Sequence, residues 1–299
     1  MSLIALLAVL LLGTGEAAAH GGQHDDWLTK WTFDPLVVVP LTIGTLLYAI
    51  GGLRLYNRGV DGKLLILRGA AFGAGVCALV VALVAPVHWL GGQLFAWHMI
   101  EHQVIMVIAP PLIVLGRPRG PLIWGLPMRW RAPAGRFVGR VTRARWATPL
   151  KSIAGATALH ALALWIWHLP ILYEGALDND LTHWLQHVSF MSTALLFWWA
   201  VLRRGAAAGL VAPLAILVTS VHSMFLALLI IVSTEPLYPS QTKSPSPWTA
   251  LDDQQLAGLV MATPVGFVYL LAALIVAERS LMHLRSSRGL TPRCVPPST

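Results

Sequence analysis

Residues 95–118 read FAWHMIEHQVIMVIAPPLIVLGRP. The stretch is apolar over about the 20 residues that a transmembrane helix requires, yet it carries His98, Glu101 and His102. Ionisable side chains are costly in lipid, and those inside a span usually face the interior of a helix bundle. We therefore predict a membrane-spanning helix that presents these three side chains to neighbouring helices.

The rest of the chain has the composition of a polytopic membrane protein. Of its 299 residues, 56% are hydrophobic and 11% are charged, and the mean hydropathy is +0.67. A soluble domain carries roughly a quarter charged residues. Seven apolar runs are long enough to span, at residues 36–56, 64–84, 94–115, 152–172, 181–202, 210–233 and 255–277. We predict an all-α domain of seven transmembrane helices over residues 35–278, followed by a cytoplasmic tail at 279–299.

The first 19 residues form a separate segment. Residues 3–12 are an apolar run too short to span, and Glu16 and the small residues 17–19 follow it. This pattern is typical of a signal peptide. Cleavage before His20 would leave residues 20–34 as an extracytoplasmic segment ahead of the first helix. The alternative is an uncleaved anchoring segment, and both alternatives place His20 outside.

The positive charges predict the orientation. With the amino end outside, 19 of the 21 Lys and Arg residues fall on the cytoplasmic side, and Lys30 and Lys243 fall outside. This asymmetry follows the positive-inside rule. The net charge of +8 therefore reflects topology, and we expect no nucleic-acid partner. The connection at residues 117–151 holds nine cations and no acid, which suits anionic membrane lipids; the cytoplasmic loops of a partner protein are the alternative.

Ten of the 11 histidines fall in outer segments or at or above the predicted midplane of the membrane. Two i,i+4 pairs, His98/His102 and His183/His187, each occupy one helix face. Imidazoles that converge in an outward cavity would bind copper, zinc, iron or nickel. The candidate ligands are His20, His24, His98, His102, His160, His168, His183, His187 and His222. A lone mid-helix histidine is as readily a hydrogen-bonded packing residue, and His88, in an outer connection, requires no ligand role.

Methionines accompany the histidines. Met99 follows His98, and Met224 lies two residues after His222. Thioether together with imidazole favours copper(I) over zinc, although methionine at helical spacing is more often core filler. The chain has two cysteines and no C-x-x-C, which argues against a thiolate cage. We therefore expect copper as the metal, with Met99, Met224 and Glu101 as further candidate ligands.

His98, Glu101 and His102 also spell H-x-x-E-H, a signature of metalloproteases. In that alternative Glu101 is the general base, and an acid of the outer loop at residues 174–180 supplies the third ligand. The motif is short, and it does not account for the other outward histidines. We retain an intramembrane metalloprotease as a remote alternative.

Haem is an alternative from another class of function. Two histidines on different helices can hold a haem axially, and the space between the helices of a bundle can house it. His98 or His102 paired with His183 or His187 would suit such a site. A strong Soret band in the absorption spectrum would favour haem, whereas a colourless protein would favour copper(I).

Four blocks carry a resemblance to a known family. They are WHMIEHQVIMVIAPPLIVLGRP at 97–118, ALHALALWIWHLPILYEGALDNDLTHWLQHVSFMSTALLFWW at 158–199, HSMFLALLI at 222–230 and DQQLAGLVMATPVGFVYL at 253–270. Together they resemble successive blocks of the seven-helix CtaG family of cytochrome c oxidase assembly factors. The blocks follow the family order and the resemblance extends from about residue 35 to residue 277.

The resemblance implies a bacterial plasma-membrane protein of the respiratory chain, required to make an active haem–copper oxidase. Copper delivery, as a metallochaperone, is the usual proposal for such proteins. The positions that match the family's histidines are His98, His102, His160, His168, His183, His187 and His222. Glu101 stands where the family usually has an amide, so it is either an extra ligand or a group that tunes His98.

Taken together, the residues and the resemblance predict an assembly factor that handles copper and catalyses no reaction. It would accept copper at the outer face and pass it to an oxidase subunit within the membrane. Its expected partners are haem–copper oxidase subunits and membrane lipids, and a periplasmic copper donor is a further candidate.

Overall fold

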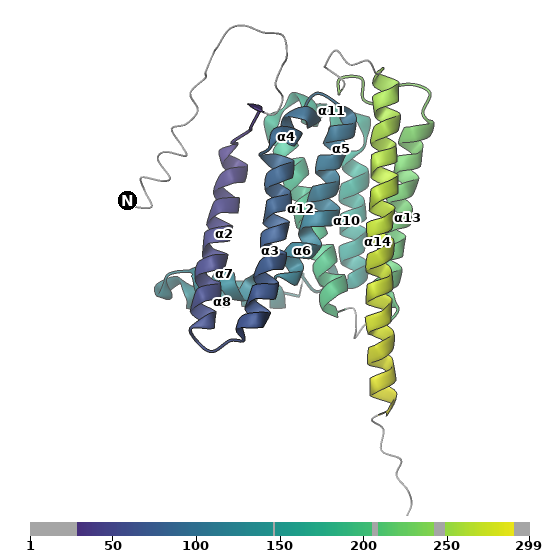
Figure 1. Ribbon diagram of the computed structural model, residues 1–299. Helices are drawn as coiled ribbons and strands as arrows, with labels where there is room; N and C mark the ends of the chain where they lie inside the picture. Colours follow the sequence, from purple (N-terminus) through teal and green to yellow (C-terminus); the bar gives the residue numbers. More distant parts are fainter. Residues whose placement is uncertain (1–28, 146, 205–208, 242–248, 290–299) are drawn as a thin grey trace, which may run out of the picture.

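A computed structural model describes residues 29–145, 147–204, 209–241 and 249–289 (Figure 1). Within these ranges the regular elements are all helical, and no strand occurs. Six helices are long and apolar enough to cross a membrane, and a bent pair adds a seventh span when its two parts are counted together. The predicted all-α, polytopic membrane fold is confirmed.

The spans run alternately between two ends of a helix bundle (Figure 1). They are α2 (Pro35–Tyr56), α3 (Gly62–Leu83), α5 (Phe95–Gln103) with the π-helical turn η2 (Val104–Ile108) and α6 (Ala109–Leu115), α10 (Ile153–Trp167) with α11 (Pro170–Asp178), α12 (Asp180–Arg204), α13 (Val211–Val232) and α14 (Ala250–Gly289). Shorter helices are α4 (Pro86–Gly91), α7 (Arg119–Gly125), α8 (Met128–Arg143) and α9 (Ala147–Lys151). We call the end that carries α4 and α11 the histidine end, and the end that carries α7 and α8 the arginine end.

The fourth predicted span is broken. Helix α10 ends at Trp167, and α11 begins at Pro170 after a bend of 72°. Proline has no amide hydrogen to continue a helix, and its ring pushes the preceding residue into an extended conformation. Leu169 accordingly has φ −65° and ψ 129°. Helix α10 therefore crosses the bundle, α11 folds over the histidine end, and His168 lies in the bend.

The third span changes its pitch directly after His102. Pro110 and Pro111 cannot donate hydrogen bonds, so the carbonyl of Met106 has no partner in either an α-helical or a π-helical pattern. Trp198 of α12 donates its indole N–H to this carbonyl at 3.0 Å. The π-helical turn η2 lies between His102 and these prolines. Helix α12 is thereby held against the third span one helical turn from the histidine pair.

The connection at residues 117–151 is largely helical and lies across the arginine end (Figure 1). Helix α8 is amphipathic, with basic residues beside exposed Trp130 and Phe137. Helix α7 meets α2 backbone to backbone, because a Cβ atom at Gly51 or at Gly125 would lie 1.8 Å or 2.1 Å from a carbonyl oxygen of the other helix. Arg54 of α2 donates to the three carbonyls of residues 124–126 at 2.7–3.0 Å, which satisfies the end of α7.

The last helix is longer than the sequence suggested. Residues 255–277 were expected to span and residues 279–299 to form a tail, whereas α14 begins at Ala250 and continues to Gly289. At its start, Thr249 and Asp252 exchange hydrogen bonds of 2.7–3.1 Å as a capping box. Without a proline or glycine after residue 266, the helix continues until Gly289.

Candidate metal centre at the histidine end

Six histidines from four segments meet at the histidine end. We call them the histidine group: His88 of α4, His98 and His102 of α5, His168 of the α10–α11 bend, and His183 and His187 of α12. The ring centroids of the i,i+4 pairs lie 4.2 Å and 4.3 Å apart. Between the helices, His98 lies 5.5 Å from His183, and His102 lies 5.4 Å from His187. The two pairs that the sequence placed on separate helix faces therefore face each other.

Several ring nitrogens of this group are buried and unpartnered. His168 donates its Nδ1–H to the carbonyl of Leu164 at 2.7 Å, which leaves Nε2 with a lone pair. Among the described residues, this Nε2, the Nε2 atoms of His98 and His183 and both nitrogens of His102 are buried without a hydrogen-bond partner. Buried polar atoms are nearly always paired. An imidazole that binds a metal typically donates its other N–H to a carbonyl, so His168 has the arrangement of a ligand.

The donors do not form a closed cage. In the part of the chain that the structure describes, no three His, Cys, Asp or Glu side chains are placed to hold one ion together. The group extends in two directions from the facing pairs. The ring centroids of His88 and His183 are 5.9 Å apart, and those of His102 and His168 are 6.4 Å apart. The arrangement is an open set of imidazoles, able to offer an ion two nitrogens at a time.

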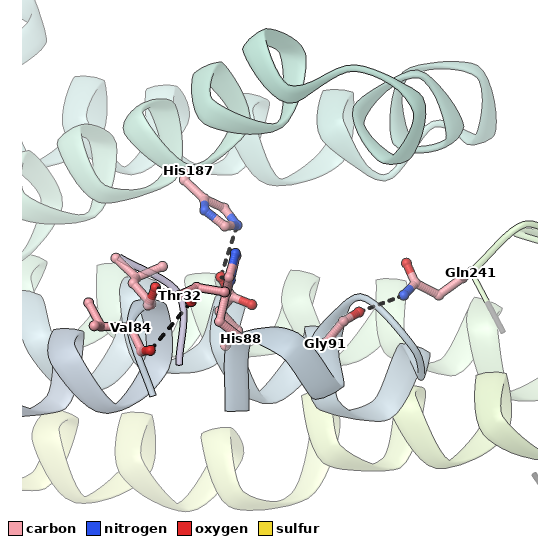
Figure 2. A network of polar contacts seen from close by, with 8 residues as sticks. Thr32, Val84, His88, Gly91, His187 and Gln241 are labelled. Atoms are coloured by element: carbon pink, nitrogen blue, oxygen red, sulfur yellow. Dashed lines mark hydrogen bonds and ion pairs between the residues drawn. The ribbon is translucent and has the colours of Figure 1, made fainter. Parts of the chain in front are cut away.

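Glu101 lies inside the group and is buried. Its Oε1 accepts a hydrogen bond from His88 Nδ1 at 2.9 Å and lies 3.5 Å from His187 Nε2; Figure 2 shows His187 pointing from α12 toward His88. Burial lowers the pKa of His88, but the hydrogen bond and negative charge of Glu101 outweigh it, so the pKa of His88 is raised. The sequence suggested His98 as the group that Glu101 tunes, whereas the structure pairs Glu101 with His88 and His187.

Asp253 of α14 fixes the start of α5. Its two carboxylate oxygens accept hydrogen bonds from the backbone N–H groups of Phe95 and Ala96, at 2.7 Å and 3.0 Å. These N–H groups belong to the first helical turn, which has no internal acceptors for them. Asp253 was not among the predicted site residues. The sequence feature that could have drawn attention to Asp253 is its position as an acidic residue near the start of an apolar helix, in the block DQQLAGLVMATPVGFVYL.

A second set of buried polar residues supports the α4–α5 turn. Gln241 donates from Nε2 to the carbonyl of Gly91 at 2.8 Å (Figure 2) and accepts from the Tyr173 hydroxyl at 2.8 Å. Tyr238 donates to the carbonyl of His168 at 2.7 Å. The residues Tyr238 and Gln241, between α13 and α14, therefore tie the end of the His88 helix α4 to the bend that carries His168.

Two predicted histidines lie apart from the group. His160 is buried, with Nδ1 3.2 Å from Thr193 Oγ1 and its ring stacked 5.6 Å from Phe197. These contacts match the packing alternative for this residue. His222 on α13 is half-buried, and neither of its ring nitrogens has a partner among the described residues.

The predicted methionine ligands also lie outside the group. Met99 is fully buried in the hydrophobic core, and Met224 is 47% exposed in a shallow groove between α13 and α14. His20 and His24 fall outside the described residues. His88 is the member that the sequence prediction left out, because its approach to His183 depends on α4 folding back over α5.

Comparison with known proteins identifies the family. The profile of the cytochrome c oxidase caa3 assembly factors (Caa3_CtaG) matches residues 46–282, which is most of the chain and reaches from within α2 to near the end of α14. The chain belongs to the Caa3_CtaG family. The resemblance drawn from the sequence blocks is confirmed, and the profile describes this family as cytochrome c oxidase caa3 assembly factors.

Relatives of this Caa3_CtaG protein occur in mycobacteria. An uncharacterised protein of Mycobacterium bovis and one of Mycobacterium tuberculosis are each 28% identical over 181 residues, which is 58% of this chain and 27% of theirs. An uncharacterised protein of Mycobacterium leprae is 26% identical over 184 residues, 59% of this chain and 27% of its own. The matched part is thus about a quarter of the length of these relatives. No solved structure matches the chain.

Proposed function

We propose that this Caa3_CtaG protein binds copper in the histidine group and delivers it to a haem–copper oxidase during assembly. The observation that carries the proposal is the concentration of buried, unpartnered imidazole nitrogens at one end of the bundle. Each unpartnered buried polar atom costs about 1–3 kcal/mol, and a bound ion would offset this cost. Imidazole is a preferred ligand of copper.

The open arrangement of the group supports transfer more than storage. A carrier must release its ion, and two-nitrogen sites exchange an ion more readily than a closed cage. The His88 side chain is 27% exposed, whereas Glu101 behind it is 1% exposed. Copper would therefore enter and leave at His88 and move inward to the His98/His102 and His183/His187 pairs. Copper transfer requires exchangeable metal ligands and no cleavage of a covalent bond, so the protein would not be an enzyme.

We place the histidine end at the extracytoplasmic face of a bacterial plasma membrane. The support is the distribution of Lys and Arg, since the arginine end carries the basic helix α8. Copper supplied by a periplasmic donor would then meet the histidine group directly. The recipient would be a metal-binding subunit of the oxidase that lies beside this protein in the membrane.

The geometry gives less support to the two alternatives. A protease would need His98, His102 and an acid of residues 174–180 to hold one ion together, but no three such side chains are so placed in the part of the chain that the structure describes. A haem would need a flat slot between two histidines. The His102 ring instead packs against Phe190, with 4.9 Å between ring centroids.

A copper(I)-binding measurement on the purified protein tests the proposal. We expect His98→Ala and His102→Ala each to lower the bound copper by at least half, because each removes one donor of a two-nitrogen site. Glu101→Gln should keep its copper, since the amide oxygen can still accept from His88. His283→Ala, on the arginine side of α14, is the control and should match the wild type. Full copper in both histidine variants would contradict the proposal.

A further inference from the structure

A large cavity lies at the arginine end, away from the histidine group. Its volume is about 1060 Å³, and helices α2, α3, α6, α7 and α12 form its walls. Four arginines line it, Arg68, Arg117, Arg119 and Arg203, and its lining contains no acid. Among the described residues, none of the four forms an ion pair with an Asp or Glu side chain. The cavity is therefore a cationic site with no acidic counter-charge from the residues that the structure describes.

The rest of the lining is apolar and aromatic. Phe72 of α3, Ile113 of α6, and Leu195, Leu196 and Trp199 of α12 contribute to it. A small inorganic anion would leave this wall uncovered. A molecule with an anionic head and a hydrocarbon body would cover both the arginines and the apolar wall.

The turn that carries Arg117 is fixed by packing. Arg117 has a positive φ of 48°, a conformation that non-glycine residues rarely adopt unless the surroundings impose it. The preceding Gly116 accepts a hydrogen bond from the Tyr48 hydroxyl at 2.7 Å, and a Cβ atom there would lie 2.7 Å from the side chain of Phe72. Arg203 of α12 lines the same cavity as Arg117 and Arg68, so like charges from three segments share one space. An anion between them would reduce the mutual repulsion of these like charges.

We propose that this cavity binds an anionic phospholipid from the adjoining leaflet, with its phosphate among Arg68, Arg117 and Arg203. An acyl chain would lie along the wall formed by Phe72 and Leu196. Basic pockets between transmembrane helices bind anionic head groups, and the guanidinium fork matches the oxygens of a phosphate. Ligand sites have volumes of roughly 300–1,000 Å³, so the cavity has room for a head group and the upper part of a chain.

Native mass spectrometry of the full-length protein tests the proposal. The protein is exchanged into equal amounts of phosphatidylglycerol and phosphatidylcholine with identical acyl chains, and the wild type should retain phosphatidylglycerol. The double variant Arg117→Gln/Arg203→Gln should bind it about 30-fold more weakly, given the contribution of each basic residue to anionic-lipid binding. The control Arg136→Gln/Arg140→Gln removes the same charge from α8, outside the cavity, and should change binding less than threefold.

Two further variants separate lipid binding in the cavity from misfolding and from a purely ionic site. Arg117→Lys/Arg203→Lys keeps the charge and should retain most of the binding, which guards against misfolding of the glutamine variant. Leu196→Trp fills the apolar wall and should weaken phosphatidylglycerol binding. The proposal would be overturned if the Arg117/Arg203 and Arg136/Arg140 glutamine variants lost phosphatidylglycerol binding equally. Retention of phosphatidylcholine as well as phosphatidylglycerol by the wild type would also overturn it, as would displacement of phosphatidylglycerol by equimolar inorganic phosphate.

Discussion

The carboxylate of Asp253 shows how one residue can orient a site to which it contributes no ligand. It lies on the last helix, yet both of its oxygens bind the first turn of α5, one turn before His98. An anion is stabilised there by the unpaired N–H groups and by the helix dipole. The position of the His98/His102 pair relative to α14 thus depends on this contact, which the sequence could not reveal because its partners are 157 and 158 residues away.

We predict that Asp253→Asn lowers the stability of the protein. The amide has one acceptor oxygen and no charge, so one N–H of the α5 turn loses its partner, at a cost of about 1–3 kcal/mol. Thermal unfolding in detergent measures the loss, and copper content should fall in the same preparations. Glu278→Gln, which changes an exposed carboxylate on the same helix, should leave both unchanged. If the two variants unfold alike, the cap does not stabilise α5.

At the scale of elements, two spans deviate from the uniform helices that apolar runs suggest. Pro170 breaks the fourth span and turns His168 inward, and Pro110 and Pro111 accompany the π-helical turn after His102. The prolines were visible in the sequence, but the direction of each bend depends on neighbouring helices. The partner of the Met106 carbonyl, Trp198, lies on another helix. Run length therefore predicted where the spans lie, and tertiary contacts determined their shape.

The crossing of α2 and α7 gives a prediction at this scale. Gly51→Ala would place a methyl group 1.8 Å from a carbonyl oxygen of α7, and such overpacking typically costs about 1–3 kcal/mol or more. Gly52→Ala is a matched control, because a Cβ atom there meets nothing within 4 Å, and alanine in a helix stabilises it by about 0.5–1 kcal/mol. Unfolding temperature should fall for Gly51→Ala and hold or rise for Gly52→Ala. The reverse order would contradict the observed crossing.

Across the whole molecule, the two ends of the bundle have different chemistry. The histidine end gathers buried imidazoles, and the arginine end gathers cations over an apolar cavity. The i,i+4 spacing was enough to predict the His98/His102 and His183/His187 pairs as neighbours in a common site. Spacing alone could not exclude His160 from this group. His160 lies on α10, which leads into the bend at His168, but its ring contacts Thr193 within the bundle. Spacing also missed His88, which is joined to the group through a short helix rather than a span.

The copper content of the oxidase made in cells tests the central claim most directly. Oxidase is purified from cells that express the wild type, His98→Ala, His102→Ala or Glu101→Gln, and its copper-to-haem ratio and activity are measured. We predict that His102→Ala yields oxidase with normal haem, depleted copper and little activity, and that Glu101→Gln stays close to the wild type. Fully metallated, active oxidase with both His98→Ala and His102→Ala would contradict copper delivery by this group. If Glu101→Gln yields inactive oxidase while the variant itself still binds copper, the result would instead indicate a hydrolytic role for the glutamate.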